Sequence, residues 1–242
     1  MSRFIDKLKQ TSRSEPQPMG FGKAAEIIKP RLLLVAEAKS AYVSAVEGAD
    51  AVLLDSKPKN PPAETDLPAG VRLFGTKADR LEGIDFAVLL PDMPVKMVED
   101  ENIGRVMAVE ASTEMGLLRS LESLPLDAVM IIGDGVQTPL VTWHYLMLCR
   151  RLAATCGKPL LASVAPDITR GELQLVWQAG VDGVVTAAKS AGGIKKLRAM
   201  IDKLIPPERG QRQKSRAIVP AMSQASTAVA EEEDEEYDDD EE

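Results

Sequence analysis

The sequence is poor in the residues that build several common kinds of site. Among its 242 residues there are one histidine and two cysteines, and aromatic residues make up only 4%. A single histidine excludes metal sites built from several histidines, and it leaves no sign of a Ser-His-Asp triad. Cys149 and Cys156 fall in one predicted helix about 10 Å apart along its axis, too far for a mutual disulfide. We expect both to be reduced core residues.

Long apolar runs and a leader segment are also missing. No apolar run approaches the roughly 18 residues that predict a membrane-spanning helix, and the chain does not start with a charged segment followed by an apolar one. Within residues 1–19 only Phe4, Ile5 and Leu8 can form an apolar face, which is too short for a membrane anchor. These features predict a cytoplasmic protein without membrane contact, and a flexible segment over residues 1–19.

Negative charge is concentrated at the end of the chain. The formal net charge is −8, but residues 231–242, EEEDEEYDDDEE, hold 11 of the 37 acids and no base. Residues 20–204 hold 21 bases and 23 acids, which offers no basic field for a phosphate backbone. We therefore predict no nucleic-acid binding by this part. Residues 205–242 are predicted to be a disordered linker and acidic tail that binds a basic protein partner.

The tail prediction has a consequence for stability. Deleting residues 207–242 is expected to change the Tm by no more than about one or two degrees, because a segment of this composition buries no apolar surface. Differential scanning calorimetry of the full and the shortened chain measures the change. A loss of many degrees would show instead that the tail packs against the folded part.

Short apolar segments alternate with helical stretches along residues 20–204. Several are apolar at consecutive positions, which is typical of parallel strands buried on both faces. Every second segment opens alike, with GADAV at Gly48, GIDFAV at Gly83, PLDAV at Pro125 and GVDGV at Gly180. This recurrence over eight βα units predicts an α/β fold, a (β/α)8 TIM barrel. The eight segments are RLLLVAEA from Arg31, ADAVLLD from Ala49, VRLFGT from Val71, IDFAVLL from Ile84, RVMAVEA from Arg105, DAVMIIG from Asp127, KPLLASVA from Lys158 and VDGVVTA from Val181.

The connections between these strands differ along the chain. The segments after strands two to four are short, polar or broken by prolines, so we predict shortened crossovers there. Thr138 followed by Pro139 predicts the start of the sixth helix, and Thr169 with Glu172 predicts a capping box on the seventh. Methionines and tryptophans at helical spacing are predicted to lie in the core: Met115, Met130, Met147, Trp143 and Trp177.

Acidic residues occur at both ends of the predicted strands. Those that introduce strands lie at the bottom of the barrel, where we expect structural roles because the chemistry of such barrels lies at the other end. They are Asp50, Asp85, Asp127 and Asp182. Four others, Glu37, Asp55, Glu110 and Asp134, end strands directly and so mark the expected active face. Oxygen ligands in this ring suit Mg²⁺ or Mn²⁺, and the neighbouring-strand pair Glu110 and Asp134 is the predicted metal site. The alternative is that each acid is a solvated loop residue or a cap.

The last βα turn, AAKSAGGIKK from Ala187, suggests an anion site. It places Lys189, Ser190, Gly192 and Gly193 at the start of the eighth helix, where free N–H groups and the helix dipole attract a negative group. An ordinary helix cap explains the same residues. This site would make the protein a barrel that binds a phosphorylated ligand.

From Val106 to about Leu204 the order of motifs resembles the HpcH/HpaI and citrate lyase β-chain family of class II 2-oxo-acid aldolases. VMAVEASTEMGLLRSLESLPLDAVMIIGDG is similar to that family's strand ending in a metal-binding glutamate, its next helix and its strand ending in "IG". The segments GKPLL and AGVDGV resemble the family's later strands. The resemblance covers about 40% of the chain.

The resemblance implies roles for particular residues. Glu110 matches the first metal ligand, and Asp134 is the carboxylate nearest to the position of the second. Asp55 matches the acid of the family's "DxEH" turn, with Pro58 standing at the histidine position. Arg72 in VRLFG corresponds to the arginine of the family's "VRVP". By this resemblance Arg72 and Asp55 are the catalytic residues.

These observations favour a divergent aldolase-type barrel, acting as a divalent-metal-dependent carbon–carbon lyase on a small anionic 2-oxo acid. In that reaction Arg72 neutralises the oxyanion and the metal stabilises the enolate. Two alternatives stay open: a noncatalytic scaffold that interacts through its acidic tail, and a barrel that binds a phosphorylated ligand. The sequence also leaves open whether the chain forms a homo-oligomer.

Overall fold

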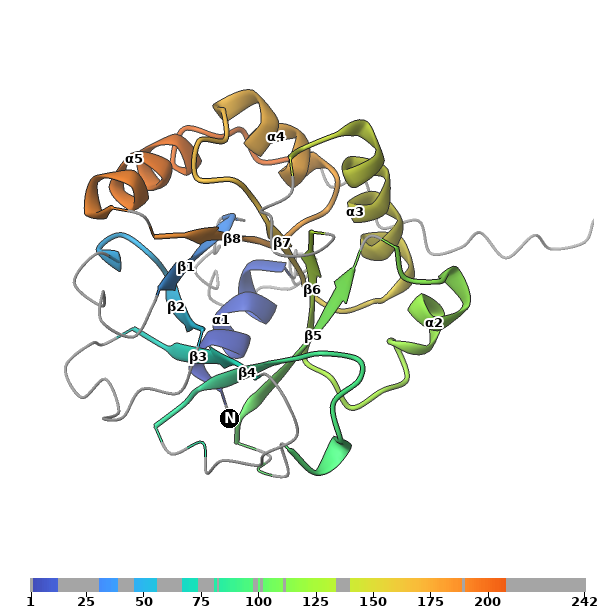
Figure 1. The fold of residues 1–242 in the computed structure, drawn as a ribbon. Helices are drawn as coiled ribbons and strands as arrows, with labels where there is room; N and C mark the ends of the chain where they lie inside the picture. Colours follow the sequence, from blue (N-terminus) through green and yellow to red (C-terminus); the bar gives the residue numbers. More distant parts are fainter. Residues whose placement is uncertain are drawn as a thin grey trace, which may run out of the picture. The chain divides into compact units, whose positions relative to one another are not determined.

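The computed structural model describes residues 2–12, 31–38, 46–55, 67–73, 81, 83–97, 100, 102–110, 112–133, 140–188 and 190–207. Eight parallel strands follow one another around a closed barrel, and the last pairs with the first (Figure 1). The chain is therefore a TIM barrel, as the sequence predicts. The strands are β1 (Leu33–Ala38), β2 (Ala51–Leu54), β3 (Ala69–Arg72), β4 (Phe86–Leu89), β5 (Gly104–Glu110), β6 (Ala128–Ile132), β7 (Leu160–Ser163) and β8 (Gly183–Ala187).

One strand differs from its predicted position in a way that matters for the site. The sequence pattern starts the third strand at Val71, whereas β3 starts at Ala69 and ends at Arg72. Its partners in β4 run from Phe86 to Val88, with Val88 opposite Arg72. Arg72 therefore lies at the carboxyl end of its strand, where residues of a parallel barrel reach the mouth.

The helices are well formed in the second half of the chain. After β5 come α2 (Met115–Ser120), α3 (Trp143–Thr155), α4 (Arg170–Gln178) and α5 (Ala191–Ile201), each following one of the last four strands. Between β4 and β5 the described residues hold only the 3-10 turn η2 (Val95–Met97), in agreement with a shortened crossover. Most residues of the crossovers after β2 and β3 lie outside the described part.

The sequence correctly predicts the start of α4 but not the start of α3. The capping box of α4 is present: Thr169 Oγ1 accepts from the N–H of Glu172, and the Glu172 side chain accepts from the N–H of Thr169. For α3 the predicted start at Thr138 is wrong, because the N-cap is Thr142, whose side chain accepts from the N–H of Tyr145. Thr138 and Thr142 both precede a stretch of helical character, but the described residues become helical only after Thr142.

The core has two layers separated by the sheet. Side chains from alternate strand positions fill the barrel, among them Leu33, Val35, Val106 and Met130. The intervening positions pack outward against α2 to α5. Met130 and Trp177 are buried as predicted, but Trp143 and Met147 are 76% and 62% exposed, so their assignment to the core is wrong. Helical spacing alone did not separate the inner face of α3 from its outer face.

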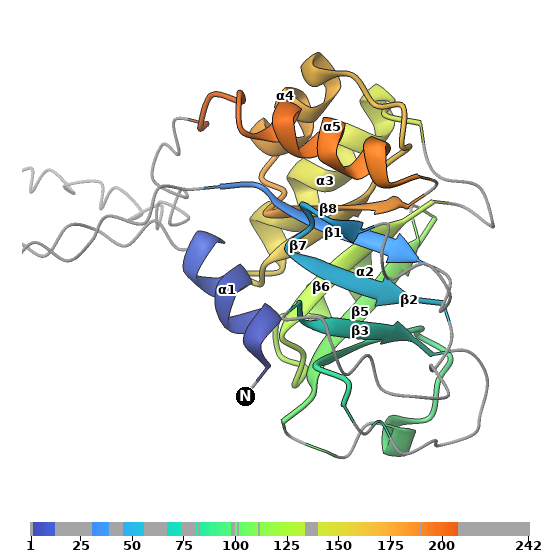
Figure 2. The same ribbon diagram turned by 90° about the vertical axis from the view of Figure 1, so that its left-hand side faces the viewer.

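The N-terminal residues form a helix that enters the bottom of the barrel. Helix α1 (Arg3–Ser12) lies at the end from which the strands start, opposite their arrowheads (Figure 2). Phe4, Ile5 and Leu8 are completely or almost completely buried and belong to the core inside the barrel. The expectation of a flexible segment is therefore wrong for residues 3–12. The three apolar side chains are too few for a membrane anchor but sufficient to fill a barrel end.

Glycines inside the barrel make room for this helix. A Cβ on Gly104 would come within 2.4 Å of Ile5 Cγ1, and a Cβ on Gly70 would come within 2.2 Å of the Phe86 ring. Phe86 in turn stacks on Phe4, with ring centroids 4.5 Å apart. The Phe86 ring thus occupies the space beside Gly70, and Ile5 occupies the space beside Gly104.

The four strand-opening aspartates have structural roles, as expected. Three of them accept from the backbone N–H of the neighbouring strand: Asp50 from Leu34, Asp127 from Arg105 and Asp182 from Leu160. In each case the aspartate N–H donates to the carbonyl of that same residue. The aspartate that recurs at these strand openings therefore marks a repeated pair of hydrogen bonds between neighbouring strands.

Asp85, the fourth of these aspartates, holds α1 instead. Its carboxylate accepts from the Ser2 hydroxyl and from the N–H groups of Arg3 and Phe4, at 2.8 to 2.9 Å. These N–H groups belong to the helix start and have no partner within the helix. Lys7 and Lys9 add ion pairs of 2.8 Å to Asp50 and Asp127. The strand-opening aspartates therefore both link neighbouring strands and hold α1 at the bottom of the barrel.

None of the helices within the described residues is long and apolar enough to cross a membrane. The acidic tail lies outside the described residues.

Candidate functional site

Polar side chains gather at the mouth of the barrel, where β1, β2 and β3 end. Glu37 follows the inward-facing Leu33 and Val35 of β1, and Asp55 follows the inward-facing Ala51 and Leu53 of β2. Because side chains alternate along a strand, both acids are placed on the inner side. Arg72 shares its face of β3 with Gly70, which touches the interior ring of Phe86. Three charged groups thus lie at the end where TIM barrels carry their chemistry.

Arg72 and Glu37 form a direct ion pair across the mouth. The Arg72 NH2 nitrogen lies 2.7 Å from Glu37 Oε1, and the two side chains are 21% and 20% exposed. The Arg72 Nε is buried and has no hydrogen-bond partner within the described part of the chain. The Arg72 guanidinium is therefore held by one carboxylate on one side, and it has N–H groups left that can donate to a ligand.

Glu37 also interacts with the second acid. Burial raises the pKa of the Glu37 carboxyl above its ordinary value of 4.5, Arg72 lowers it, and the charge of Asp55 together with a hydrogen bond between the two carboxyls raises it further. The net direction is upward. A neighbouring carboxylate opposes the ionisation of Glu37, so the Glu37 carboxyl keeps its proton to a higher pH than an ordinary glutamate does.

The raised pKa predicts how stability depends on pH. Above pH 4.5 native Glu37 binds a proton more tightly than unfolded Glu37, so the free energy of unfolding decreases as pH rises through the native pKa. Glu37→Gln is expected to remove this decrease while leaving the opposite contributions of groups such as Glu172, whose pKa is lowered, in place. Urea unfolding of both proteins from pH 4.5 to 8 measures the difference. Parallel pH profiles would contradict a raised pKa for Glu37.

The predicted metal pair is described only in part. Glu110 is the last residue of β5, is exposed, and accepts a 3.4 Å hydrogen bond from the Ser112 hydroxyl. Its place at the mouth agrees with the sequence prediction, and the helix after β5 starts beyond it, with Glu114 at the N-cap. Asp134 lies outside the described residues. Among those that are described, no three histidine, cysteine, aspartate or glutamate side chains form a metal-binding group.

The metal site therefore stays a prediction with a binding test. Mn²⁺ or Mg²⁺ is expected to raise the Tm of the wild type, by the equivalent of about 2.7 kcal/mol if the ion reaches one hundred times its Kd. Glu110→Gln is expected to abolish that shift. The Tm of both proteins is measured with and without millimolar ion. If the ion shifts the Tm of neither protein, Glu110 is a solvated residue at a strand end and not a metal ligand.

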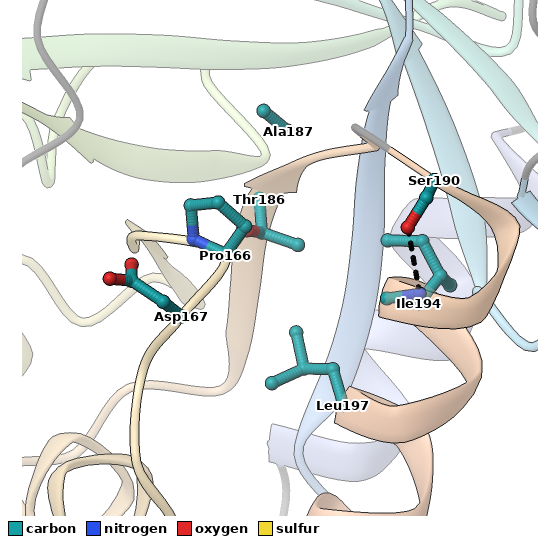
Figure 3. Close-up of a pocket in the computed structure, with 8 residues that line it drawn as sticks. Pro166, Asp167, Thr186, Ala187, Ser190, Ile194 and Leu197 are labelled. Atoms are coloured by element: carbon teal, nitrogen blue, oxygen red, sulfur yellow. Dashed lines mark hydrogen bonds between the residues drawn. The ribbon is translucent and has the colours of Figure 1, made fainter.

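A cavity of about 330 Å³ lies between α5 and the turn after β7 (Figure 3). Ser190 is the N-cap of α5, and its Oγ accepts a 3.2 Å hydrogen bond from the N–H of Gly193. The N–H groups of the first helical turn otherwise have no partner within the helix. Ala187, which lines the cavity, is the register partner of Glu37 in β1. The remaining lining residues are Pro166, Asp167, Thr186, Ile194 and Leu197.

Thr186 is the residue of this cavity that sequence reasoning missed. It is 1% exposed, and its hydroxyl has no hydrogen-bond partner among the residues that the structure describes. A buried hydroxyl without a partner is uncommon and suggests that a ligand or water completes it. In the sequence Thr186 is one position of the apolar strand VDGVVTA, so nothing distinguished it. Of the four predicted anion-binding residues, Ser190, Gly192 and Gly193 form the start of α5, and Lys189 lies outside the described residues.

Asp167 is the one described acid that lines the cavity. In Figure 3 its carboxylate points away from α5. The cavity therefore combines hydrogen-bond donors at one end with an acid at its rim.

Comparison with solved structures places the fold. The tryptophan synthase complex from Pyrococcus furiosus matches with 13% sequence identity over 71% of this chain and 97% of that one, at a TM-score of 0.51. A mutant tryptophan synthase alpha-subunit from the same hyperthermophile matches with 14% identity and the same coverage, at a TM-score of 0.52. This chain has the fold of a TIM barrel. At such low identity the likeness concerns the barrel alone.

Comparison of the sequence itself adds no relatives. No protein-family description matches it, and no curated protein matches it. The TIM-barrel fold is thus established, whereas membership of the HpcH/HpaI family is not.

Proposed function

We propose that this barrel is a carbon–carbon lyase for a small anionic carbon acid, with Glu37, Asp55 and Arg72 as its working groups. The observation that carries the proposal is the Arg72–Glu37 ion pair of 2.7 Å, beside Asp55, at the mouth of the barrel. Arg72 and Asp55 are the residues that the sequence resemblance suggests for catalysis, and Glu37 joins them through its ion pair. A 2-oxo acid is the substrate class that this resemblance favours.

The three groups supply what such a reaction requires. The Arg72 guanidinium binds a carboxylate or an oxyanion, since its fork of N–H donors suits planar anions. In the cleavage direction the Glu37–Asp55 pair takes the proton of the substrate hydroxyl. The adjacent carbon–carbon bond then breaks, its electrons form the enolate, and the pair returns the proton to carbon. Proton transfer of this kind contributes about 10² to 10⁴ in rate.

A divalent ion would add Lewis-acid stabilisation of the enolate if Glu110 and Asp134 hold one. The described residues contain one of these two groups, so the proton-transfer roles are assigned independently of the metal.

Enolisation tests the proposal without knowledge of the second product. The full chain is incubated in D₂O with pyruvate and other 2-oxo acids, with EDTA or with Mn²⁺ or Mg²⁺, and loss of the proton next to the carbonyl is followed by NMR. At least one compound is expected to exchange faster than in buffer alone, and Glu37→Gln is expected to remove the acceleration. No acceleration with any compound would favour the noncatalytic scaffold, whose acidic tail binds a basic partner.

Binding of a phosphorylated ligand is a second candidate, favoured by the cavity beside α5. Its unpartnered Thr186 hydroxyl, the Ser190 cap and the first-turn N–H groups suit a phosphate group. The negative charge of Asp167 repels an anion, so the hydrogen bonds from these donors must contribute more to binding than this repulsion costs. Inorganic phosphate and small phosphate monoesters are expected to raise the Tm of the wild type.

Two variants make that test specific. Thr186→Val is expected to weaken the phosphate-dependent shift, whereas Thr155→Val, at a half-buried threonine near the end of α3 and away from the cavity lining, should leave it unchanged. A shift that is equal in both variants would mean that phosphate acts elsewhere on the protein.

A further inference from the structure

Arg72 already forms an ion pair with Glu37 when no ligand is bound. Its NH2 nitrogen is already 2.7 Å from Glu37 Oε1. Among the described inward-facing residues at the carboxyl ends of the strands, Arg72 is the sole cation. An anionic ligand that enters the mouth and uses this guanidinium in a bidentate pair must therefore take the place of Glu37 on it.

Displacing Glu37 leaves it facing an acid. On the side of β2 its register partner is the apolar Leu53, and Asp55, which directly follows β2, is hydrogen-bonded to its carboxyl. On the other side β1 pairs with β8, where Glu37 lies opposite Ala187, which has no ionisable group. Lys189, two residues farther along, lies outside the described residues. Once a ligand holds Arg72, the described groups around Glu37 provide no positive charge.

The charges can be balanced in one simple way. Arg72, ionised Glu37 and ionised Asp55 together carry one negative charge, and an incoming carboxylate makes two. Both side chains of the ion pair are about four-fifths buried, so an uncompensated second charge is costly. One proton shared between the Glu37 and Asp55 carboxyls restores the original sum.

We propose that the barrel mouth binds a small carboxylate together with one proton, with Arg72 receiving the carboxylate and the displaced Glu37 sharing the proton with Asp55. This inference rests on the proposed function for the choice of site and of ligand, and it adds the link between binding and pH.

Isothermal titration calorimetry of the full chain tests this directly. The probes are acetate, pyruvate, oxalate and malonate, titrated at several pH values between 5 and 8. Each titration is repeated in imidazole and in bis-tris, cationic buffers that differ in ionisation enthalpy and do not compete as anions. At least one probe is expected to bind with proton uptake that approaches one at the upper pH values. Its Kd should then rise by up to about tenfold per pH unit.

Three variants separate the roles. Glu37→Gln is expected to bind the same probe with no proton uptake and a Kd that no longer changes with pH. Arg72→Gln is expected to lose binding by tenfold or more. Glu114→Gln, which changes an exposed acid at the start of α2, should retain both the affinity and its pH dependence.

The outcomes discriminate between this inference and the proposed function. Binding without proton uptake in the wild type, or uptake that persists unchanged in Glu37→Gln, overturns the inference even if the protein catalyses enolisation. Absence of binding by all four probes up to tens of millimolar also overturns it. Proton-linked binding without any deuterium exchange would support the inference and contradict the lyase proposal.

Discussion

Replacing Phe4 with alanine is expected to destabilise the barrel by about 3–5 kcal/mol, the cost of removing a large aromatic side chain from a packed core. Phe4 has no exposed surface and stacks on Phe86 inside the barrel. The space cannot close easily, because α1 is fastened at its start by Asp85 and along its length by two lysine ion pairs. A cavity at the bottom of the barrel would therefore persist.

Urea unfolding measures this loss. The midpoint should fall while the slope stays the same, because the variant exposes a similar surface on unfolding. Gln10→Ala is the matched control, since Gln10 is an exposed residue of the same helix and the change should stay within about 0.5 kcal/mol. A Phe4→Ala protein as stable as the control would mean that α1 does not close the barrel in solution.

Replacing Asp55 with asparagine is expected to lower the rate of enolisation by about 10² to 10⁴, the range for loss of a positioned proton-transfer group. Asparagine keeps the shape of the side chain and its ability to accept a hydrogen bond from Glu37, but it cannot take a proton from substrate or share one. The initial rate of deuterium exchange at saturating substrate, compared with the wild type, gives the number.

Controls for that variant address fold and site separately. The Tm of Asp55→Asn should stay near that of the wild type, because a half-buried residue at a strand end contributes little packing. Glu114→Gln should exchange at the wild-type rate. An Asp55→Asn protein with full activity would exclude Asp55 from proton transfer and leave Glu37 as the sole candidate base of the described mouth cluster.

The barrel was predictable because its strands repeat a chemical unit. The glycine or proline, the aspartate and the apolar run recur because three of the four aspartates form two hydrogen bonds with one residue of the preceding strand, as Asp50 does with Leu34 and Asp127 with Arg105. The role of Asp85 was not predictable in detail. It has the same local sequence, but its partner is a helix more than eighty residues away in the chain.

Helix α1 shows why short amphipathic segments are ambiguous in sequence. Phe4, Ile5 and Leu8 form an apolar face too small to stabilise an isolated helix. Their burial depends on a hollow left by Gly70 and Gly104, which lie in two different strands. No local pattern connects a glycine in a strand to a phenylalanine near the start of the chain.

The candidate site was predictable residue by residue but not as a cluster. The rule that chemistry lies at strand ends selected Glu37 and Asp55, and a motif resemblance selected Arg72. Their contact depends on β3 ending at Arg72 rather than continuing to Thr76, which the apolar pattern did not indicate. Thr186 lay beyond sequence reasoning altogether, since its significance is that its hydroxyl has no partner.

The claim at the centre of this account is that Glu37, beside Asp55 and Arg72 at the barrel mouth, keeps its proton to a higher pH than an ordinary glutamate. A ¹³C NMR titration of side-chain carboxyls in the full chain tests it most directly, with Glu37 assigned by comparison with Glu37→Gln. The account predicts that Glu37 titrates above its ordinary pKa of 4.5, and that Asp55→Asn moves its pKa down toward that value. A Glu37 carboxyl that titrates at or below 4.5 in the wild type, with no response to Asp55→Asn, would contradict it.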